Sequence, residues 1–549
     1  MGGANTAKPS GTPSKPTRRK VLTVAATAGA GVAASRLLGL RDLDQRAIAA
    51  TLNGTTARSP MTMGESSMAA AFEPAEPMLE LLPEPTPAPG ATAAPPPPSL
   101  SPSTTPTSSA TPRPSPVPAR TAAPAAAPAR PETVVAPRAA STDWVAPFGT
   151  EAGKIGHLLR RTTFGPTRAE HERALAEGYA KTLERILETP AAPPIALADT
   201  PAKNLQQLQQ WWVDQMIQSP TPFAEAMTLF WHGHFTSDYR KVGMQQPYLY
   251  WQNQTWRTLA LGDLRTLLKQ ATVDPAMLRY LDLGISTGRN PNENYARELM
   301  ELFTMGAGTF TEDDVRAGAK ALAGWRLPRA NETVQTGVFD RQRAFAGQVT
   351  FLGKTGALDA DGVIDQILVQ DATAPHIVDA VWTTFVSPQP SAAALARLAA
   401  RFRTSKYDVK ALLRDVLTSP EFLAPEAYRA LVKSPTELMV SFARVLSAPT
   451  LARSIGSAGD PMGQRLFDPP SVAGWPVNGS WISSSTMISR SNFIATALSQ
   501  VKELPPVDDA HLRVLDGVLA PGTAALLNRT ADARQRWSVI LSSPEFQLK

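Results

Sequence analysis

The chain has 549 residues, a net charge of +6 and no cysteine. The lack of cysteine excludes disulfides, thiolate metal ligands and cysteine nucleophiles. Eight basic and two acidic residues precede position 50 and carry this charge by themselves, so the rest of the chain is close to neutral. The basic character therefore belongs to the N-terminal segment, and we expect no nucleic-acid partner.

Residues 1–49 are typical of an export signal. The paired arginines Arg18 and Arg19 are followed by a short run of small, weakly apolar residues at 21–34. A basic region before such a run favours export, and the arginine pair favours the twin-arginine route. We therefore predict an exported protein of the cell envelope or the medium. The alternatives are a chance basic N-terminus and an uncleaved anchor, which would be the protein's one attachment to the membrane.

Residues 50–140 are rich in Pro, Ala, Thr and Ser, and include four consecutive prolines at 95–98. A segment of this composition buries too little apolar surface to offset the entropy lost on ordering. We predict a long disordered linker. It would act either as a stalk that crosses or leaves the envelope or, after cleavage of the signal, as an untethered tail.

From residue 150 to 549 the chain is predicted to form a multi-helix globular body. Apolar residues recur at spacings of three and four, as in Leu205-Leu208-Trp212 and Leu395-Leu398-Phe402. Short breaks that contain proline separate these runs. The fold class is therefore mainly α. The exception is 334–353, where two short β-prone runs flank a polar region and predict one small β-hairpin insertion.

One short sequence occurs twice. Residues 417–422 read Leu-Thr-Ser-Pro-Glu-Phe, and residues 541–546 read Leu-Ser-Ser-Pro-Glu-Phe. Each copy follows an amphipathic run, and the Ser-Pro step disfavours further helix. We interpret the pair as a repeated helix end.

Residues 290–306 predict a helix with both ends marked, by Asn292 as the N-cap and by Gly306 after its last residue. Most of its surface is apolar, so we expect it to be largely buried. Four polar residues nevertheless share one stripe, namely Asn294, Arg297, Glu298 and Glu301. A buried charge needs a partner. The stripe is therefore either an internal Arg-Glu brace between helices or a polar site.

A second polar group consists of His232 and His234, which lie among aromatic residues at the end of a predicted helix. On a continuing helix their side chains would diverge by about 200°, whereas an extended backbone after the intervening glycine would place both on one side. The second arrangement would make half of a Zn, Fe or Mn site, completed by Glu298 or Glu301. The alternative is two histidines hydrogen-bonded in the core. His157 is a further candidate.

A third group is the segment 465–476, rich in Pro, Gly and Trp, together with Trp481. Such a loop in a helical protein lines a cleft or stacks on sugars. The alternative is a loop that is simply held in place by its aromatic side chains.

Taken in order, the segments at 157–165, 230–235, 292–306, 417–422, 467–475 and 490–493 resemble the bacterial family called domain of unknown function 1800. The sequence Asn-Glu-Asn-Tyr-Ala-Arg-Glu-Leu-Met-Glu-Leu from residue 292 is its most specific match. The resemblance implies an exported, mostly helical protein but no activity. It draws attention to the residues that match the family's motifs: His157, His232, His234, Asn294, Arg297, Glu298 and Glu301.

The chain also departs from that pattern. Many members resemble one another in a His-Asp pair and a Lys, at positions where this chain has Ala344, Phe345 and Val349. This departure argues against any mechanism that needs those groups.

Two functions follow as hypotheses. The first is a metal-assisted hydrolase or related envelope enzyme that holds a divalent transition metal. Its metal ligands would be His232, His234 and Glu301, and its catalytic residues would be Glu298 as general base, Arg297 to hold it, and Asn294. The second is a non-catalytic envelope scaffold, which would bind another exported protein or a cell-wall polysaccharide and would use the same charges as braces.

Overall fold

The computed structural model describes residues 144–195, 204–329, 332 and 334–549. The predicted export signal at 1–49 and the predicted linker at 50–140 lie outside these residues. Within the described ranges the chain forms 22 α-helices and two small two-stranded sheets, which confirms the mainly α fold. None of the described helices is long and apolar enough to cross a membrane.

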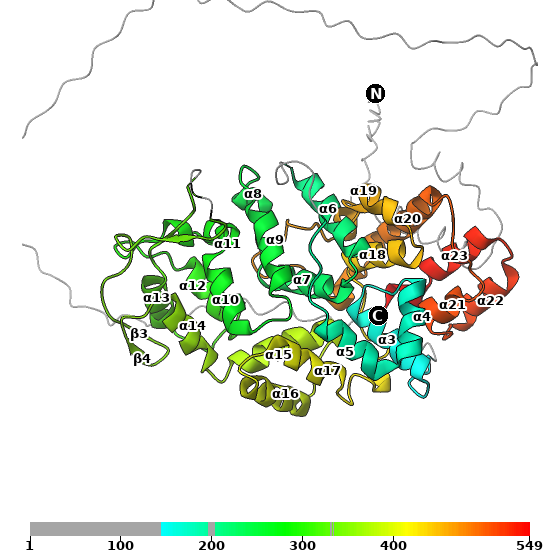
Figure 1. Cartoon of the computed structure of the whole chain (residues 1–549), viewed down its shortest axis with the longest axis horizontal. Helices are drawn as coiled ribbons and strands as arrows, with labels where there is room; N and C mark the ends of the chain where they lie inside the picture. Colours follow the sequence, from blue (N-terminus) through cyan, green and yellow to red (C-terminus); the bar gives the residue numbers. More distant parts are fainter. Residues whose placement is uncertain (1–143, 196–203, 330–331, 333) are drawn as a thin grey trace, which may run out of the picture. The chain divides into compact units, whose positions relative to one another are not determined.

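Figure 1 labels the elements in their order along the chain. The first seven helices are α3 (Glu151–Thr162), α4 (Arg168–Glu177), α5 (Tyr179–Glu188), α6 (Leu205–Gln218), α7 (Pro222–His234), α8 (Tyr239–Val242) and α9 (Tyr248–Thr258). The next group is α10 (Leu264–Val273), α11 (Pro275–Tyr280), α12 (Asn294–Glu301), α13 (Glu312–Ala321), β1 (Trp325–Arg326), β2 (Val338–Phe339), β3 (Val349–Phe351), β4 (Lys354–Gly356) and α14 (Ala360–Leu368).

The second half of the body is entirely helical. Its α-helices are α15 (Thr373–Phe385), α16 (Ala392–Thr404), α17 (Val409–Leu417), α18 (Pro435–Val445), α19 (Ala452–Ile455), α20 (Ser484–Gln500), α21 (Ala510–Leu515), α22 (Pro521–Arg529), α23 (Ala533–Ser542) and α24 (Pro544–Gln547). Single 3-10 turns also occur, at Leu283–Ile285, Pro425–Ala427, Pro449–Leu451, Asp460–Met462 and Asn478–Trp481.

Polar side chains mark where many of these helices begin. The hydroxyls of Thr167 and Ser434 accept hydrogen bonds from the backbone N–H three residues later, and Glu170 and Glu437 bond back to the capping residue. This capping box satisfies backbone donors that the first turn of a helix leaves free. The local sequence therefore sets the helix starts, and packing sets which helices meet.

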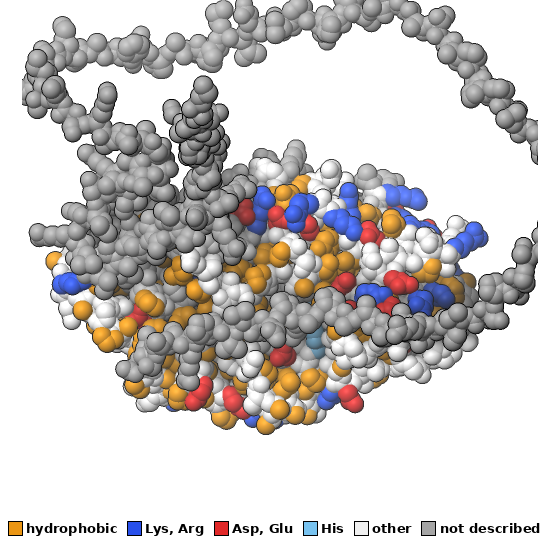
Figure 2. Space-filling view, turned by 180° about the vertical axis from the view of Figure 1, so that it is seen from behind, with side chains coloured by type: hydrophobic (Ala, Val, Ile, Leu, Met, Phe, Trp, Pro, Cys, Tyr) orange, Lys and Arg blue, Asp and Glu red, His pale blue; other side chains and the backbone are white. Residues whose placement is uncertain are grey.

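Most buried apolar side chains form one large core, in which Trp212, Trp231 and Trp256 are fully buried. Ile155, Leu159 and Ala174 form a small separate cluster. Helix α6 packs on both α18 and α19, while α7 packs on α9 and α3. Segments far apart in sequence thus meet near the middle of the body, where Figure 1 also places the C-terminus. Figure 2 shows basic and acidic side chains interspersed on one face, in keeping with paired surface charges such as Arg265 and Asp365.

The predicted single β-hairpin is wrong in its pairing. Strand β2 pairs with β1, and β3 pairs with β4, so the two runs expected to face each other belong to different sheets. Leu352 and Gly353 have φ angles of 46° and 83°, which makes a tight two-residue turn between β3 and β4. Turns of this kind join adjacent antiparallel strands. The sequence lacks the Asn-Gly or Asp-Gly signal that would have identified this one.

The repeated Ser-Pro-Glu-Phe segment is a repeated helix end, as predicted. Ser419 Oγ donates to the Val416 carbonyl and accepts from the Phe422 N–H. Ser543 Oγ makes the same two bonds, with the carbonyl of Ile540 and the N–H of the phenylalanine that follows. The two copies are the same local stop after α17 and α23.

Candidate functional site

The helix expected across 292–305 is α12, and it is shorter than predicted. It begins at Asn294, whose N–H donates to the Asn292 side chain at 2.9 Å, and it ends at Glu301. The Met300 carbonyl then accepts from the N–H groups of both Met305 and Gly306, which closes a wider turn. Gly306 has a φ of 88°, the left-handed conformation expected of it.

The apolar face of α12 is buried as predicted, but its polar stripe is not. Tyr295, Leu299 and Met300 are fully buried, whereas Asn294 is exposed and Arg297 is half-buried. Glu298 and Glu301 are also half-buried. Charges at the edge of the body keep part of their hydration, so they do not need the internal partners that a buried stripe would require.

Arg297 braces α12 against α13 and does not hold Glu298. Its two terminal nitrogens donate to both carboxylate oxygens of Glu312, each at 2.7 Å. Asn294 Nδ2 donates instead to Asp282 at 3.1 Å. Arg297 and Asn294 of the stripe therefore form surface contacts between neighbouring elements.

Among the described residues, the carboxylate of Glu298 makes no hydrogen bond or ion pair. Partial burial and the neighbouring Glu301 raise the pKa of Glu298, and Arg297 opposes them. A carboxylate of this kind contributes little to stability when it is ionised. We expect Glu298→Gln to change the free energy of unfolding by no more than about 0.5 kcal/mol in urea titrations at pH 7. A loss of 2 kcal/mol or more would show that Glu298 is a structural brace.

Helix α7 continues through both His232 and His234, so their side chains diverge. His232 Nε2 accepts from the Phe467 N–H at 3.2 Å. His234 Nε2 donates to the Phe303 carbonyl at 2.9 Å. Burial lowers the pKa of His232 to about 3 and is the largest cause of the lowering for His234, to about 4. Both imidazoles are therefore neutral, and each has one ring nitrogen hydrogen-bonded to a backbone group.

The structure does not bring the assigned metal ligands together. In the described ranges no group of three or more His, Asp or Glu side chains is placed to hold a metal ion. The shared half-site required α7 to end between the two histidines, and it ends after the second. His157 is also buried, and its Nε2 donates to the Phe422 carbonyl at 3.1 Å. The geometry matches the alternative of hydrogen-bonded core histidines.

The histidine segment and the end of α12 do meet, through backbone carbonyls. His234 bonds the carbonyl of Phe303, and His376 of α15 bonds the carbonyl of Leu302 at 2.9 Å. The two imidazole rings lie 6.2 Å apart. The carbonyls that follow a helix lack intrahelical partners, so these histidines fix the end of α12.

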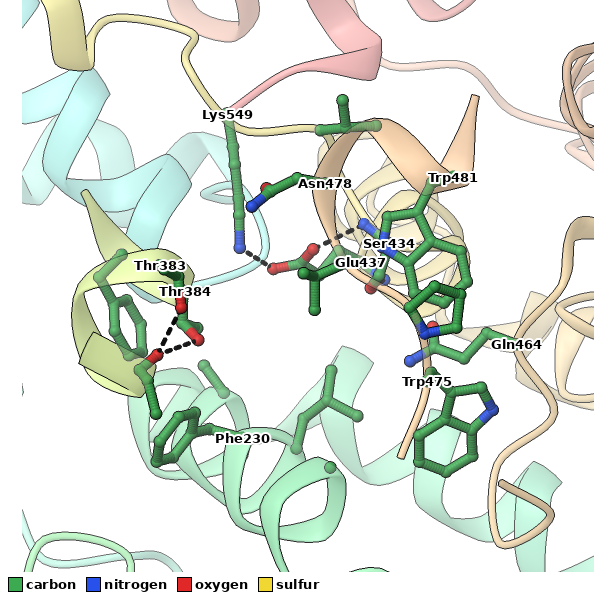
Figure 3. A pocket seen from close by; sticks show the side chains of 18 of the residues that line it. Phe230, Thr383, Thr384, Ser434, Glu437, Gln464, Trp475, Asn478, Trp481 and Lys549 are labelled. Carbon is green, nitrogen blue, oxygen red and sulfur yellow. Dashed lines mark hydrogen bonds and ion pairs between the residues drawn. The ribbon is translucent and has the colours of Figure 1, made fainter. Parts of the chain in front are cut away.

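A cleft of about 250 Å³ opens beside His234, and we call it the central cleft. In Figure 3, Trp475, Trp481 and Gln464 lie on one side, and Phe230 lies on the other side with Thr383 and Thr384. Its remaining lining includes Arg161, Glu437, Asn478 and Lys549. It is built by α3, α7, α15, α18, the 464–481 segment and the last residue of the chain.

An ion pair lies in the wall of the central cleft. Lys549 Nζ contacts Glu437 Oε1, and the other carboxylate oxygen of Glu437 accepts from the Ser434 N–H at 2.7 Å (Figure 3). Burial opposes ionisation of Glu437, but Lys549 and the hydrogen bonds of Ser434 together outweigh it and lower the pKa of this carboxyl. Glu437 is thus a charged group with its partners already in place.

A family model described as "protein of unknown function (DUF1800)" matches residues 157–548. The chain belongs to the DUF1800 family. Comparison with curated proteins and with solved structures found no match. In this DUF1800 member, three of the segments that carried the resemblance contribute to the central cleft, through Arg161, Phe230, His234 and Trp475. The α12 segment does not line the cleft. His234 does, and its hydrogen bond to the Phe303 carbonyl connects the cleft to the end of that segment.

Sequence reasoning missed most residues of the central cleft of this DUF1800 protein. For the segment of Trp475 and Trp481 it left two interpretations open, a cleft lining and a loop held in place by its aromatic side chains; both tryptophans line the cleft. Glu437, Lys549 and Thr383 have no local motif that would indicate a site, because they meet only through the packing of distant helices. The doubled arginine at 160 and 161, directly after the apolar pair Leu158-Leu159, was the available signal, and both arginines are buried in α3.

Proposed function

We propose that this DUF1800 protein is an exported envelope protein that binds polysaccharide in the central cleft. The observation that carries the proposal is the combination of aromatic faces and polar groups around one opening. Trp475 and Phe230 supply aromatic surfaces, and Thr383, Gln464 and Asn478 supply hydroxyl and amide groups. Sugar rings present C–H faces that pack on aromatic rings and hydroxyls that bond to amides, so this lining suits them.

The polar groups of the cleft have bonding capacity left for a ligand. Gln464 Oε1 accepts from the Thr436 N–H, and among the described residues its amide nitrogen has no partner. The Asn478 side chain likewise has none within those residues. The Thr384 hydroxyl donates to the Ala380 carbonyl, which leaves its oxygen able to accept. The predicted signal at the N-terminus supports the envelope as the place of action.

A metal-assisted hydrolase has less support. Its proposed ligands His232 and His234 bond to separate backbone groups, and Arg297 bonds to Glu312 instead of holding Glu298 as a base. Polysaccharide binding without catalysis needs only the cleft.

The test is calorimetric titration of the purified protein with soluble wall oligosaccharides. Trp475→Ala is expected to weaken binding by about tenfold or more, because a half-buried aromatic platform carries much of the energy of such a site. Trp325→Ala is the matched control, since Trp325 is also half-buried but lies in β1, outside the cleft lining. Equal affinities for the two variants, or no binding by the wild type, would refute the proposal.

A further inference from the structure

Basic side chains outnumber acidic ones in the interior beside the central cleft. Six buried cations interact electrostatically with one another or with Glu437 there: Arg160, Arg161, Arg429, Lys433, Arg490 and Lys549. The acidic groups that face them are Glu437, Asp516 and Glu545. Buried charge is stable only when it is paired or well hydrogen-bonded, so each of these cations needs a partner.

Apart from Arg161, each cation has a carboxylate, two acceptors or an aromatic ring as a partner, although Nε and Nη2 of Arg160 lack hydrogen-bond partners among the described residues. Arg429 donates to the Leu515 carbonyl and lies over the rings of Trp144 and Tyr428. Arg160 contacts Asp516, and Lys549 contacts Glu437. Lys433 Nζ donates to Ser441 Oγ and lies 3.8 Å from the centre of an aromatic ring, that of Phe546. Arg490 donates to two oxygens, the Lys433 carbonyl and the Gln547 side chain. The carboxylates of Asp516 and Glu437 are thereby paired with Arg160 and Lys549.

Arg161 is the exception. It is 2% exposed and lines the central cleft. Its Nη2 donates to the Ala427 carbonyl at 2.6 Å. Nε and Nη1 have no hydrogen-bond partner among the described residues. A guanidinium with one neutral acceptor and two unused donors is an unusual group to bury, because its desolvation is not offset.

The electrostatic surroundings also disfavour the charged form of Arg161. Burial, and then the adjacent Arg160, lower the pKa of Arg161 to about 9, while Glu437 raises it. The carboxylate of Glu437 does not pair with it, because that carboxylate is bonded to Lys549 and Ser434. An oxyanion that entered the cleft would give Arg161 the acceptor it lacks and offset the excess of positive charge.

We propose that Arg161 binds an oxyanion of the ligand, so that the polysaccharide recognised by the central cleft is an acidic one that carries carboxylate or phosphate groups. The inference rests on the proposed function. A neutral glycan could use the aromatic and amide groups but would leave the unused donors of Arg161 unsatisfied. The acidic group enters next to α3, and the sugar rings lie toward Trp475 and Phe230.

Titration calorimetry with the full chain tests this with three probes. These are an oligosaccharide of hexuronic acid, a neutral oligosaccharide of the same length, and inorganic phosphate. The wild type is expected to bind the acidic oligosaccharide at least about tenfold more tightly than the neutral one. Phosphate is expected to compete with the acidic probe only. If phosphate alone binds, the ligand's anion is a phosphate and the Arg161 site stands while the proposed function fails.

Arg161→Gln is expected to abolish the preference, because it weakens binding of the acidic oligosaccharide by about tenfold more than binding of the neutral one. Arg168→Gln, on α4 and outside the cleft lining, is the control and should keep the preference. Equal affinity of the wild type for acidic and neutral oligosaccharides would overturn the inference and leave polysaccharide binding intact. An unchanged preference in Arg161→Gln would also overturn it. Should this variant not fold, phosphate competition on the wild type decides, and its failure counts against the site.

Discussion

Replacing Glu225 with leucine is expected to lower the free energy of unfolding by about 3 to 5 kcal/mol. Glu225 of α7 and Arg257 of α9 form a fully buried ion pair, with Nε to Oε1 at 2.5 Å and Nη2 to Oε2 at 3.0 Å. The carboxylate also accepts from Trp212 and Gln215. Removing it leaves the guanidinium buried without its counter-charge, which costs far more than the loss of a surface pair.

The double variant Glu225→Leu with Arg257→Met is expected to lose less stability than the sum of the two single variants. Both charges are then removed, so no unpaired ion remains, although Trp212 and Gln215 lose their acceptor. Urea unfolding of the four proteins gives the coupling. The exposed pair Arg265 and Asp365 is the matched control, and each of its single variants should lose no more than about 1 kcal/mol. Additive losses at the buried pair would contradict the expected coupling.

This pair also shows what the sequence could not reveal. Apolar residues at spacings of three and four predicted the helices of the body, but Glu225 is near the start of α7, where an acidic residue is ordinary at the surface. Only the packing of α9 against α7 turns that carboxylate inward. The helical body could thus be predicted from periodicity and capping residues, whereas the buried ionic contacts depended on which helices pack together.

The same limit explains the candidate site. The sequence correctly predicted a helix at α12 and the left-handed conformation of Gly306. It also indicated the structural condition for a metal site shared by His232 and His234. That condition was the end of α7, and helix boundaries are the feature least well determined by local sequence. The central cleft could not be predicted from the sequence, because Arg161, Glu437 and Lys549 are each more than a hundred residues apart and come together only in the folded chain.

Asp274→Asn is expected to stabilise the protein increasingly as pH rises from about 4 to about 7. Asp274 is buried at the start of α11, where Oδ1 accepts from the Met277 N–H at 2.8 Å and from Gln252 Nε2 at 2.7 Å. Burial raises the pKa of Asp274 to about 7. In that window the unfolded chain releases the proton and the folded chain keeps it. Wild-type stability therefore falls as pH rises and levels off above pH 7.

Asparagine keeps the oxygen that accepts from both donors and carries no charge. The Asp274→Asn variant is therefore not expected to lose stability as the pH rises. The two proteins should have similar stability near pH 4 and differ by on the order of 3 kcal/mol at pH 7.5, measured by urea unfolding across the range. Asp263→Asn, at the exposed cap of α10, is the control and should show a much smaller change with pH. Gln252 Nε2, which donates to Asp274, also donates to Ser237, three residues after His234. Ionisation of Asp274 therefore acts on a side chain that also holds the chain just after α7. A stability difference that stays constant from pH 4 to 7.5 would show that Asp274 ionises in the folded protein as readily as in the unfolded chain.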